Sequence, residues 1–194
     1  MGASTQNELP RHTRVSPDVT AVILAGGRGS RMGGIDKACA VAGDARLIDH
    51  VLSSLTSYPR IVVSSRQPQG LPTDVTVVAE DPPFAGPLAA IARGIAEVTT
   101  PYTFLTTVDA PLAAYLLPLL TAAIGDHSAA VIRSREGFLE PLIALWKSAD
   151  LAAALATTGT DGAARKLYAS GTYVEVEGNG SERDYDTLEE LAEF

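Results

Sequence analysis

Residues 20–37 read TAVILAGGRGSRMGGIDK, a short apolar run that leads directly into a glycine-rich loop. The β-branched and aliphatic residues at positions 20–24 predict a buried strand, and this strand is the first element of the fold. Glycines let the following backbone adopt positive φ angles, and successive N–H groups in such a turn form an anion-binding concavity. Arg31 and Lys37 add positive charge to the same segment. The stretch therefore predicts a strand followed by a phosphate-binding loop.

This loop has three simpler or better-known alternatives. A surface turn with incidental charges stays open, because glycines alone do not exclude it. A Walker A loop requires GxxxxGK[ST], but Lys37 follows Asp36 and precedes Ala38. A dinucleotide-binding loop requires GxGxxG or GxGxxA, but here the third glycine is displaced to Gly33, and SSR at residues 64–66 lacks the expected acidic residue. Hydride transfer on a nicotinamide is therefore disfavoured.

Beyond the loop, short apolar runs alternate with stretches of helical periodicity. Predicted strands cover residues 20–24, 60–64, 75–78, 102–108, 129–133, 141–146 and 171–176. Predicted helices cover residues 47–57, 87–98, 113–124, 148–156, 162–169 and 187–194. Such alternation is typical of an α/β fold with a mainly parallel, doubly wound sheet that is covered on both faces. Ligands of these sheets bind beyond the carboxyl ends of the strands.

Length and composition limit the function classes. We assign a single domain to residues 18–194 and expect residues 1–17, which are polar, to form a disordered leader. No apolar run approaches the roughly 18 residues that cross a bilayer, so no membrane role is expected. Cys39 is the only cysteine, so no intramolecular disulfide is possible, and a cytoplasmic location is favoured. The net charge of −8 counts against nucleic acid as a partner, although it does not exclude a single nucleotide.

The segment LAGGRGSRMGGIDK at residues 24–37 resembles the signature LAGGxxSRMGxxxK of the molybdenum cofactor guanylyltransferases. These enzymes belong to a nucleotidyltransferase superfamily with a Rossmann-like fold that also contains the cytidylyltransferases of the same cofactor. In that family the loop wraps a nucleoside triphosphate and the lysine meets its charge. The resemblance therefore implies nucleotide-binding roles for Leu24, Ala25, Gly26, Gly27, Arg31 and Lys37.

A second candidate is Asp109, which ends the predicted strand at residues 102–108. A carboxylate at a strand end is well placed for Mg²⁺, which proteins hold with one or two carboxylates plus substrate phosphates. Asp is also a favoured helix N-cap, so Asp109 could instead cap the helix that begins near Pro111. Strands that end in DxP carry the metal-binding aspartate in the resembled family. The resemblance thus implies that Asp109 binds Mg²⁺ and the nucleotide.

Two further segments bear on the nucleotide. The sequence EDPPFAGPL at residues 80–88 resembles the E-D…G-P-L segment of the family, where Asp81 matches a nucleotide-contacting acid. Asp-Pro and Gly-Pro also form turns without any ligand, and this alternative stays open. Family members often place asparagine after the second strand, and here Ser64 and Ser65 stand at that place, where either hydroxyl could bind the nucleoside.

The carboxy-terminal segment RDYDTLEEL at residues 183–191 resembles the family pattern NxNTPEEL, in which an asparagine lies close to the metal. Here aspartates stand at 184 and 186, and leucine replaces the proline. Asp186 is a candidate second Mg²⁺ ligand. It is equally a candidate N-cap of the last helix, where acidic residues are favoured by the helix dipole.

Residues of the acceptor pocket are expected in the second half of the chain. EPL at residues 140–142 resembles a segment of the same enzymes, and we expect it to line this pocket together with basic residues. An exposed helix face is the simpler explanation for Arg165 and Lys166. The predicted acceptor-binding residues are Arg133, Arg135, Glu140 and Arg165.

The resemblance implies a reaction in which GMP passes from GTP to the terminal phosphate of molybdenum-loaded molybdopterin, with release of pyrophosphate. Arg31, Lys37 and Asp109 are the predicted catalytic residues, and Mg²⁺ is the predicted cofactor. Proteins that deliver or accept the cofactor are possible partners. The alternatives are a cytidylyltransferase, which tends to carry LAAG in place of LAGG, another small-acceptor nucleotidyltransferase, and a non-catalytic nucleotide-binding module.

Overall fold

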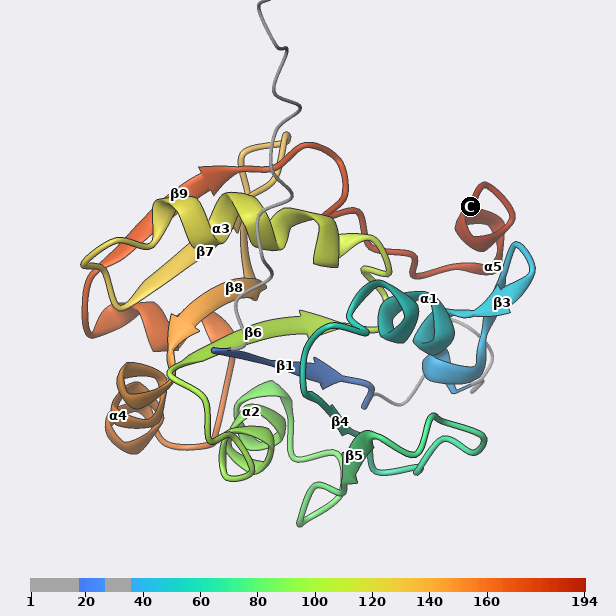
Figure 1. Ribbon diagram of the computed structural model, residues 1–194, viewed down its shortest axis with the longest axis horizontal. Coiled ribbons are helices and arrows are strands. Elements are labelled where there is room, and N and C mark those ends of the chain that lie inside the picture. The colour runs from blue at the N-terminus through green and yellow to red at the C-terminus, as the bar shows by residue number, and fades with distance from the viewer. Residues whose placement is uncertain (1–17, 27–35) are drawn as a thin grey trace, which may run out of the picture.

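The computed structural model describes residues 18–26 and 36–194, and a seven-stranded sheet in the order β5-β4-β1-β6-β8-β7-β9 forms its centre (Figure 1). Strands β5, β4, β1 and β6 are parallel, β8 runs antiparallel to β6 and β7, and β7 pairs with β9 in parallel. The strands are β1 (Val19–Leu24), β4 (Arg60–Val63), β5 (Val75–Val78), β6 (Tyr102–Thr107), β7 (Ala129–Arg133), β8 (Leu139–Lys147) and β9 (Tyr173–Glu177). The predicted α/β fold with a mainly parallel sheet is confirmed.

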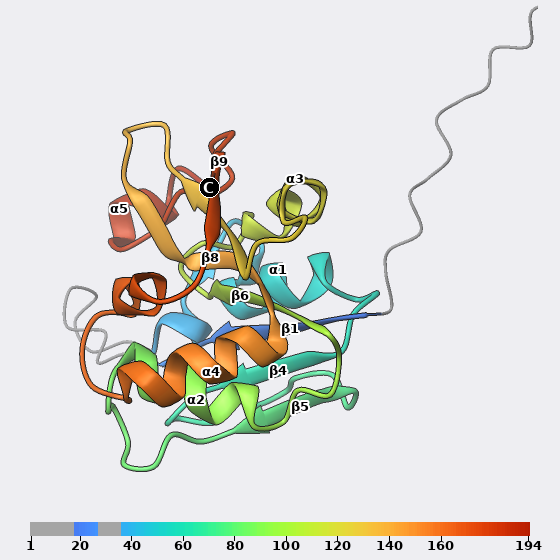
Figure 2. The same ribbon diagram turned by 90° about the vertical axis from the view of Figure 1, so that its left-hand side faces the viewer.

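Helices cover both faces of the sheet (Figure 2). One face packs against α1 (Leu47–Ser54) and α3 (Leu117–Ala123), and the other packs against α2 (Pro87–Ile95) and α4 (Ser148–Thr158). Successive side chains of β1 point to opposite faces, so Ile23 joins the core with α1 and α3, whereas Val22 joins the core with α2 and α4. The strand is therefore buried on both sides, as its apolar sequence predicts.

Helix α2 lies very close to β1 because Gly94 has no side chain. A Cβ at this position would lie 2.5 Å from Cγ1 of Val22, which no real contact permits. This close packing places α2 against β1 and β4, and the helix begins at Pro87, after Gly86, whose φ of 104° suits glycine. The sequence between β5 and α2 thus turns sharply at the carboxyl edge of the sheet.

Three parts of the chain differ from the sequence-based expectation. The helix predicted at 113–124 splits into a 3₁₀ helix, Ala113–Leu116, and α3, because Pro118 lacks the N–H that an α-helical bond to the preceding turn needs. The helix predicted at 162–169 is a 3₁₀ helix over Ala164–Ala169. A small hairpin, β2 (Val41–Ala42) with β3 (Ala45–Arg46), was not expected.

The remaining elements are a 3₁₀ helix at Lys37–Cys39 and the terminal helix α5 (Leu188–Leu191). The predicted leader, residues 1–17, lies outside the described residues, as do residues 27–35 of the glycine-rich loop. Within the described part of the chain, no helix is both long and apolar enough to cross a bilayer.

Candidate functional site

The carboxyl ends of β1 and β6 lie side by side at one edge of the sheet and carry the predicted strand-end residues. Leu24 is opposite Thr107 in the parallel register, and the N–H of Val108 donates to the carbonyl of Leu24 at 3.1 Å. Asp109 follows directly. The next helix begins only at Ala113 and Asp109 is not its N-cap, so the capping alternative does not hold.

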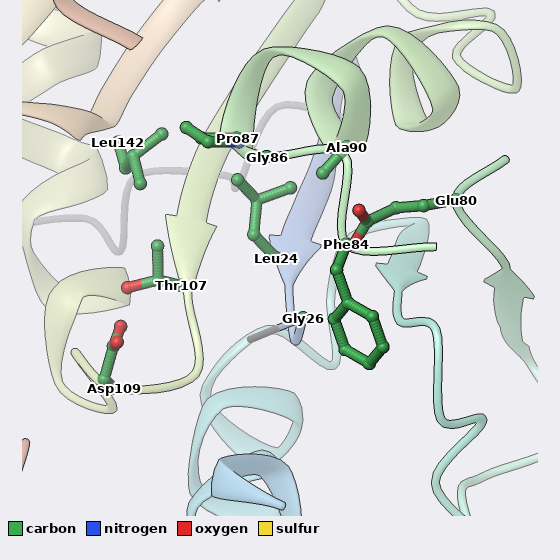
Figure 3. A pocket seen from close by; sticks show the side chains of 10 residues that line it. All are labelled: Leu24, Gly26, Glu80, Phe84, Gly86, Pro87, Ala90, Thr107, Asp109 and Leu142. Carbon is green, nitrogen blue, oxygen red and sulfur yellow. The ribbon is translucent and has the colours of Figure 1, made fainter. Parts of the chain in front are cut away.

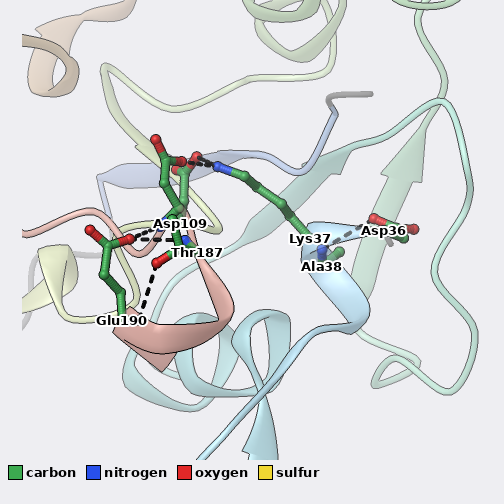
Figure 4. Close-up of polar contacts among 7 residues, drawn as sticks. Asp36, Lys37, Ala38, Asp109, Thr187 and Glu190 are labelled. Atoms are coloured by element: carbon green, nitrogen blue, oxygen red, sulfur yellow. Dashed lines mark hydrogen bonds and ion pairs between the residues drawn. The ribbon is translucent and has the colours of Figure 1, made fainter. Parts of the chain in front are cut away.

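Lys37 holds two carboxylates that come from distant parts of the sequence. Its Nζ donates to Oδ2 of Asp109 at 3.0 Å and also pairs with Oδ1 of Asp186 (Figure 4). The short helix that carries Lys37 is capped by Asp36, whose side chain accepts from the N–H of Ala38 at 3.1 Å. Partial burial opposes the charge of Lys37, but the two carboxylates outweigh it, so the pKa of this ammonium is raised. We call Lys37, Asp109 and Asp186 the Lys37 cluster.

A capping box positions Asp186 within this cluster. The side chain of Thr187 accepts from the N–H of Glu190, and the carboxylate of Glu190 accepts from the N–H groups of Asp186 at 2.7 Å and Thr187 at 2.9 Å. The expectation that Asp186 is the N-cap is therefore wrong, because Thr187 has that role. The N–H of Tyr185 donates to the carbonyl of Asp109 at 2.8 Å, which ties the segment to the tip of β6.

A cavity of about 260 Å³ opens beside the tips of β1 and β6 (Figure 3). Most of its wall is aliphatic or aromatic, while Glu80 and Asp109 contribute carboxylates from different sides. We call it the first cavity. It is lined by Leu24, Gly26, Glu80, Phe84, Gly86, Pro87, Ala90, Thr107, Asp109 and Leu142.

A second cavity, of about 370 Å³, has a wall of polar and charged residues. The pKa of Asp184 is raised to about 7, because the surrounding protein desolvates its carboxyl group and because Asp109, Glu140 and Asp186 add negative charge. Burial, together with Glu182 and Glu136, also raises the pKa of Glu140. The lining residues are Ser134, Arg135, Glu136, Glu140, Gly180, Glu182, Arg183 and Asp184.

Several residues predicted to bind the nucleotide lie outside the first cavity. The N–H of Ala25 is already used, since it donates to the carbonyl of Val63 at 2.9 Å. Ser64 is fully buried, and its hydroxyl accepts from the N–H of Arg66 at 3.2 Å. Asp81 is exposed and does not line the cavity. Among these predicted residues, the structure brings Leu24, Gly26 and Asp109 to the cavity wall.

The predicted acceptor residues divide into two groups. Arg135 and Glu140 line the second cavity. Arg133 does not: its guanidinium donates to Oε2 of Glu175 at 2.6 Å and pairs with the carbonyl of Gly137. Arg165 is exposed on the 3₁₀ helix Ala164–Ala169 and lines neither cavity. Gly27 and Arg31 lie outside the described residues.

Glu80 is a cavity residue that the sequence analysis did not select. Only 6% of the residue is exposed, and Figure 3 shows its side chain at the cavity wall. The available signal was weak, because Glu80 and Asp81 are adjacent acids and the resemblance pointed to the second. The chain bends at Asp81, and Glu80 is buried whereas Asp81 is exposed.

The donor set of the Lys37 cluster is suited to Mg²⁺. Its two carboxylates are hard oxygen ligands, and they already hold a cation, the ammonium of Lys37. Within residues 18–26 and 36–194 no group of three or more His, Cys, Asp and Glu side chains is arranged to hold a metal ion. A magnesium ion held by these carboxylates would therefore need oxygen ligands from a bound substrate or from water.

Comparison with known proteins shows the family of the chain. Residues 21–176 match the MobA-like NTP transferase domain. A molybdenum cofactor guanylyltransferase from Burkholderia lata is 33% identical over 184 residues, which cover 84% of this chain and 87% of that protein. A probable molybdenum cofactor guanylyltransferase from Natronomonas pharaonis is 34% identical over 148 residues, covering 71% and 72%.

A solved structure shares the fold. Molybdopterin-guanine dinucleotide biosynthesis protein A from Archaeoglobus fulgidus superposes with a TM-score of 0.66 at 16% identity, over 89% of this chain and 94% of that one. The family match and the relatives agree, and the chain belongs to the MobA-like NTP transferase family of nucleotidyltransferases.

Proposed function

We propose that this protein transfers GMP from GTP to the terminal phosphate of molybdenum-loaded molybdopterin and releases pyrophosphate. The observation that carries the proposal is the Lys37 cluster, a cation held between two carboxylates at the strand ends beside a cavity. Relatives that cover most of the chain are named molybdenum cofactor guanylyltransferases, which supports the choice of nucleotide and acceptor.

The reaction needs no nucleophile from the protein. An oxygen of the acceptor phosphate attacks the α-phosphorus of GTP, a new P–O bond forms, and the bond to the β-phosphate oxygen breaks with pyrophosphate as the leaving group. Both reactants are anions, so the main obstacle is to bring them together. Catalysis then consists of positioning and of charge neutralisation at fixed sites.

Lys37 is the described cation best placed for this work. Its ammonium lies at the tip of β6 beside Asp109, which also lines the first cavity. In the free protein the two carboxylates hold it in place, and in the complex it turns toward the triphosphate. Gly27 and Arg31, which lie outside the described residues, stay in the proposal as further triphosphate ligands.

Asp109 and Asp186 are the residues that would hold Mg²⁺. When bound, Mg²⁺ neutralises phosphate charge and polarises the phosphorus–oxygen bonds. Asp109 contributes a second feature through its main chain, because its carbonyl accepts from Tyr185 and so fixes Asp186 relative to the strand end. We propose that this link keeps the two carboxylates at a constant spacing.

The second cavity is the proposed acceptor site. Arg135 supplies a positive charge there, and Glu140 and Asp184 supply hydrogen-bonding carboxyl groups. Of the four predicted acceptor residues, Arg135 and Glu140 are retained. Arg133 is paired with Glu175 of β9 and Arg165 lines neither cavity, so neither residue is part of this proposal.

Pyrophosphate release tests the proposal. Purified protein is incubated with Mg²⁺ and each of GTP, ATP, CTP and UTP, with and without molybdenum-loaded molybdopterin. We expect release with GTP only, and only when the acceptor is present. Equal or faster release with CTP would assign the protein to the cytidylyltransferases. If none of the four nucleotides gives pyrophosphate, the result would favour the binding-module alternative.

A further inference from the structure

Among residues 18–26 and 36–194 the structure shows no hydrogen bond to the carboxylate of Glu80, although only 6% of the residue is exposed. A carboxylate set among mainly apolar groups is stabilised by hydrogen bonds, which water or a ligand in the cavity can supply. Glu80 faces the first cavity, where a ligand that enters can bring hydrogen-bond donors to it (Figure 3). The carboxylate can only accept hydrogen bonds, so the ligand must present N–H or O–H groups.

Gly26 makes room for this carboxylate. A Cβ at position 26 would lie 2.4 Å from Oε1 of Glu80, so alanine there would force the carboxylate out of its place. Gly26 directly follows Ala25 at the tip of β1. The N–H of Ala25 is hydrogen-bonded to the carbonyl of Val63 in β4, and this bond restricts movement of the main chain away from Glu80. The carboxylate of Glu80 therefore occupies the space that a side chain at position 26 would fill.

The walls around Glu80 suit a flat aromatic ring. Ala90, Leu24 and the ring of Phe84 lie on the same side of the cavity as Glu80, whereas Asp109 lies away from them (Figure 3). Since the Lys37 cluster includes Asp109, we expect the phosphates of a nucleotide to lie at the Asp109 side of the cavity. The base is then directed toward Glu80 and the apolar wall.

We propose that Glu80 selects guanine by accepting hydrogen bonds from its N1–H and its 2-amino group. This inference rests on the proposed nucleotidyltransferase function. Guanine presents these two donors side by side, which matches the two oxygens of one carboxylate. Adenine and cytosine each place an acceptor nitrogen beside their amino group, and uracil places its single N–H between two carbonyls. A carboxylate therefore favours guanine over the three other bases.

Ribose hydroxyls are the competing source of donors. They would also donate to a carboxylate, but an aromatic and aliphatic wall does not favour a polar ribose. Ribose hydroxyls also occur in every nucleotide. The two assignments therefore differ in one measurable respect. A contact to the base discriminates between nucleotides, whereas a contact to the ribose weakens all of them equally when it is removed.

Isothermal titration with GTP, ITP and CTP, without acceptor, tests the assignment. ITP is GTP without the 2-amino group. The unchanged protein should bind GTP about 10-fold more tightly than ITP, and CTP more weakly still, as expected for a charge-assisted contact. In Glu80→Gln the ratio of GTP to ITP affinity should fall to about 1, because the amide N–H₂ then faces the 2-amino group.

The control variant is Glu97→Gln, which neutralises an exposed acid paired with Arg93 on the surface. It should keep the GTP to ITP ratio of the unchanged protein. The loss of one negative charge changes the affinity for all three nucleotides by the same factor, and this factor cancels in the ratio. Because the comparison of GTP with ITP in the unchanged protein needs no variant, the test does not depend on the folding of Glu80→Gln, which circular dichroism checks separately.

Equal affinity of the unchanged protein for GTP and ITP would overturn the assignment. An equal loss of all three nucleotides in Glu80→Gln would also overturn it and would assign Glu80 to the ribose. A protein that discriminates GTP from ITP through Glu80 but releases no pyrophosphate would support this inference while contradicting the proposed function. The two claims therefore fail independently.

Discussion

The two cavities beside the Lys37 cluster have walls of opposite character. The first is mainly aliphatic and aromatic, and one buried acid, Glu80, lies among these groups. The second is lined almost wholly by polar and charged residues. Strand β8 contributes to both, with Leu142 in the first and Glu140 in the second. If both cavities bind substrates as proposed, they would select them by different interactions. The first would use shape and one directed contact, and the second would use charge.

The largest expected effect comes from the cation that lies next to both cavities. Lys37→Met should lower kcat/KM for GTP about 100- to 1000-fold, because a fixed positive charge is lost where phosphate charge develops. Pyrophosphate release measures this loss. Lys147→Met, which removes a lysine bound to the carbonyl of Asp126 at the other end of β8, is the matched control. Similar rates in the two variants would contradict the assignment of Lys37.

The second effect distinguishes the roles of the two cavities in nucleotide binding. Gly26→Ala should reduce the GTP to ITP affinity ratio about 10-fold, since a Cβ displaces the Glu80 carboxylate. Combined with Glu80→Gln it should add little, because both changes remove the same contact. Arg135→Ala alters only the second cavity and should leave the ratio intact. Additive losses in the double variant would show that Gly26 and Glu80 act separately.

The third effect concerns the capping box of α5, which holds Asp186 of the Lys37 cluster in position. Thr187→Ala removes the side chain that caps α5 and should lower the free energy of unfolding by about 1 kcal/mol. Since the capping box also binds the N–H of Asp186, a modest loss of activity is expected with it. Urea denaturation measures the stability. An unchanged midpoint would mean that the cap contributes nothing to the fold.

The smallest effect is a pH dependence at the second cavity. The pKa of Asp184 is about 7 in the folded protein and near 4 in an unfolded chain. Between these values the folded protein keeps a proton that the unfolded chain has lost, so the free energy of unfolding falls as the pH rises through this window and is flat above it. Asp184→Asn should make this decline shallower.

Urea denaturation at pH 5, 6, 7 and 8, without nucleotide or divalent ions, measures this pH dependence. The expected slope is small because Asp184 is partly exposed to solvent, which screens its interactions. The same pH profile in the variant and in the unchanged protein would show that Asp184 does not titrate in this range.

Much of the sheet could be predicted from local sequence. β1, β4 and β6 are short apolar runs, and Asp109 could be placed at a strand end because the apolar run stops just before it. The hairpin of β2 and β3 could not be predicted, since strands of two residues show no alternation. Pro118 divided a helix whose apolar spacing looked continuous.

The site was less predictable, because its contacts join distant segments. Asp186 and Lys37 are 149 residues apart, and no local pattern shows that they meet. Asp186 and Thr187 are both favourable N-caps, and the capping box with Glu190 decided between them. Glu80 and Asp81 have the same charge, so only the direction of the chain at the end of β5 separates the buried acid from the exposed one.

A crystal structure of the GTP complex with Mg²⁺ tests the central claim most directly. The predicted result is a nucleotide in the first cavity, with a phosphate oxygen within hydrogen-bond distance of Lys37 Nζ and with the guanine edge against Glu80. A nucleotide bound elsewhere, or one bound while Lys37 keeps both carboxylates and contacts no phosphate, would contradict it.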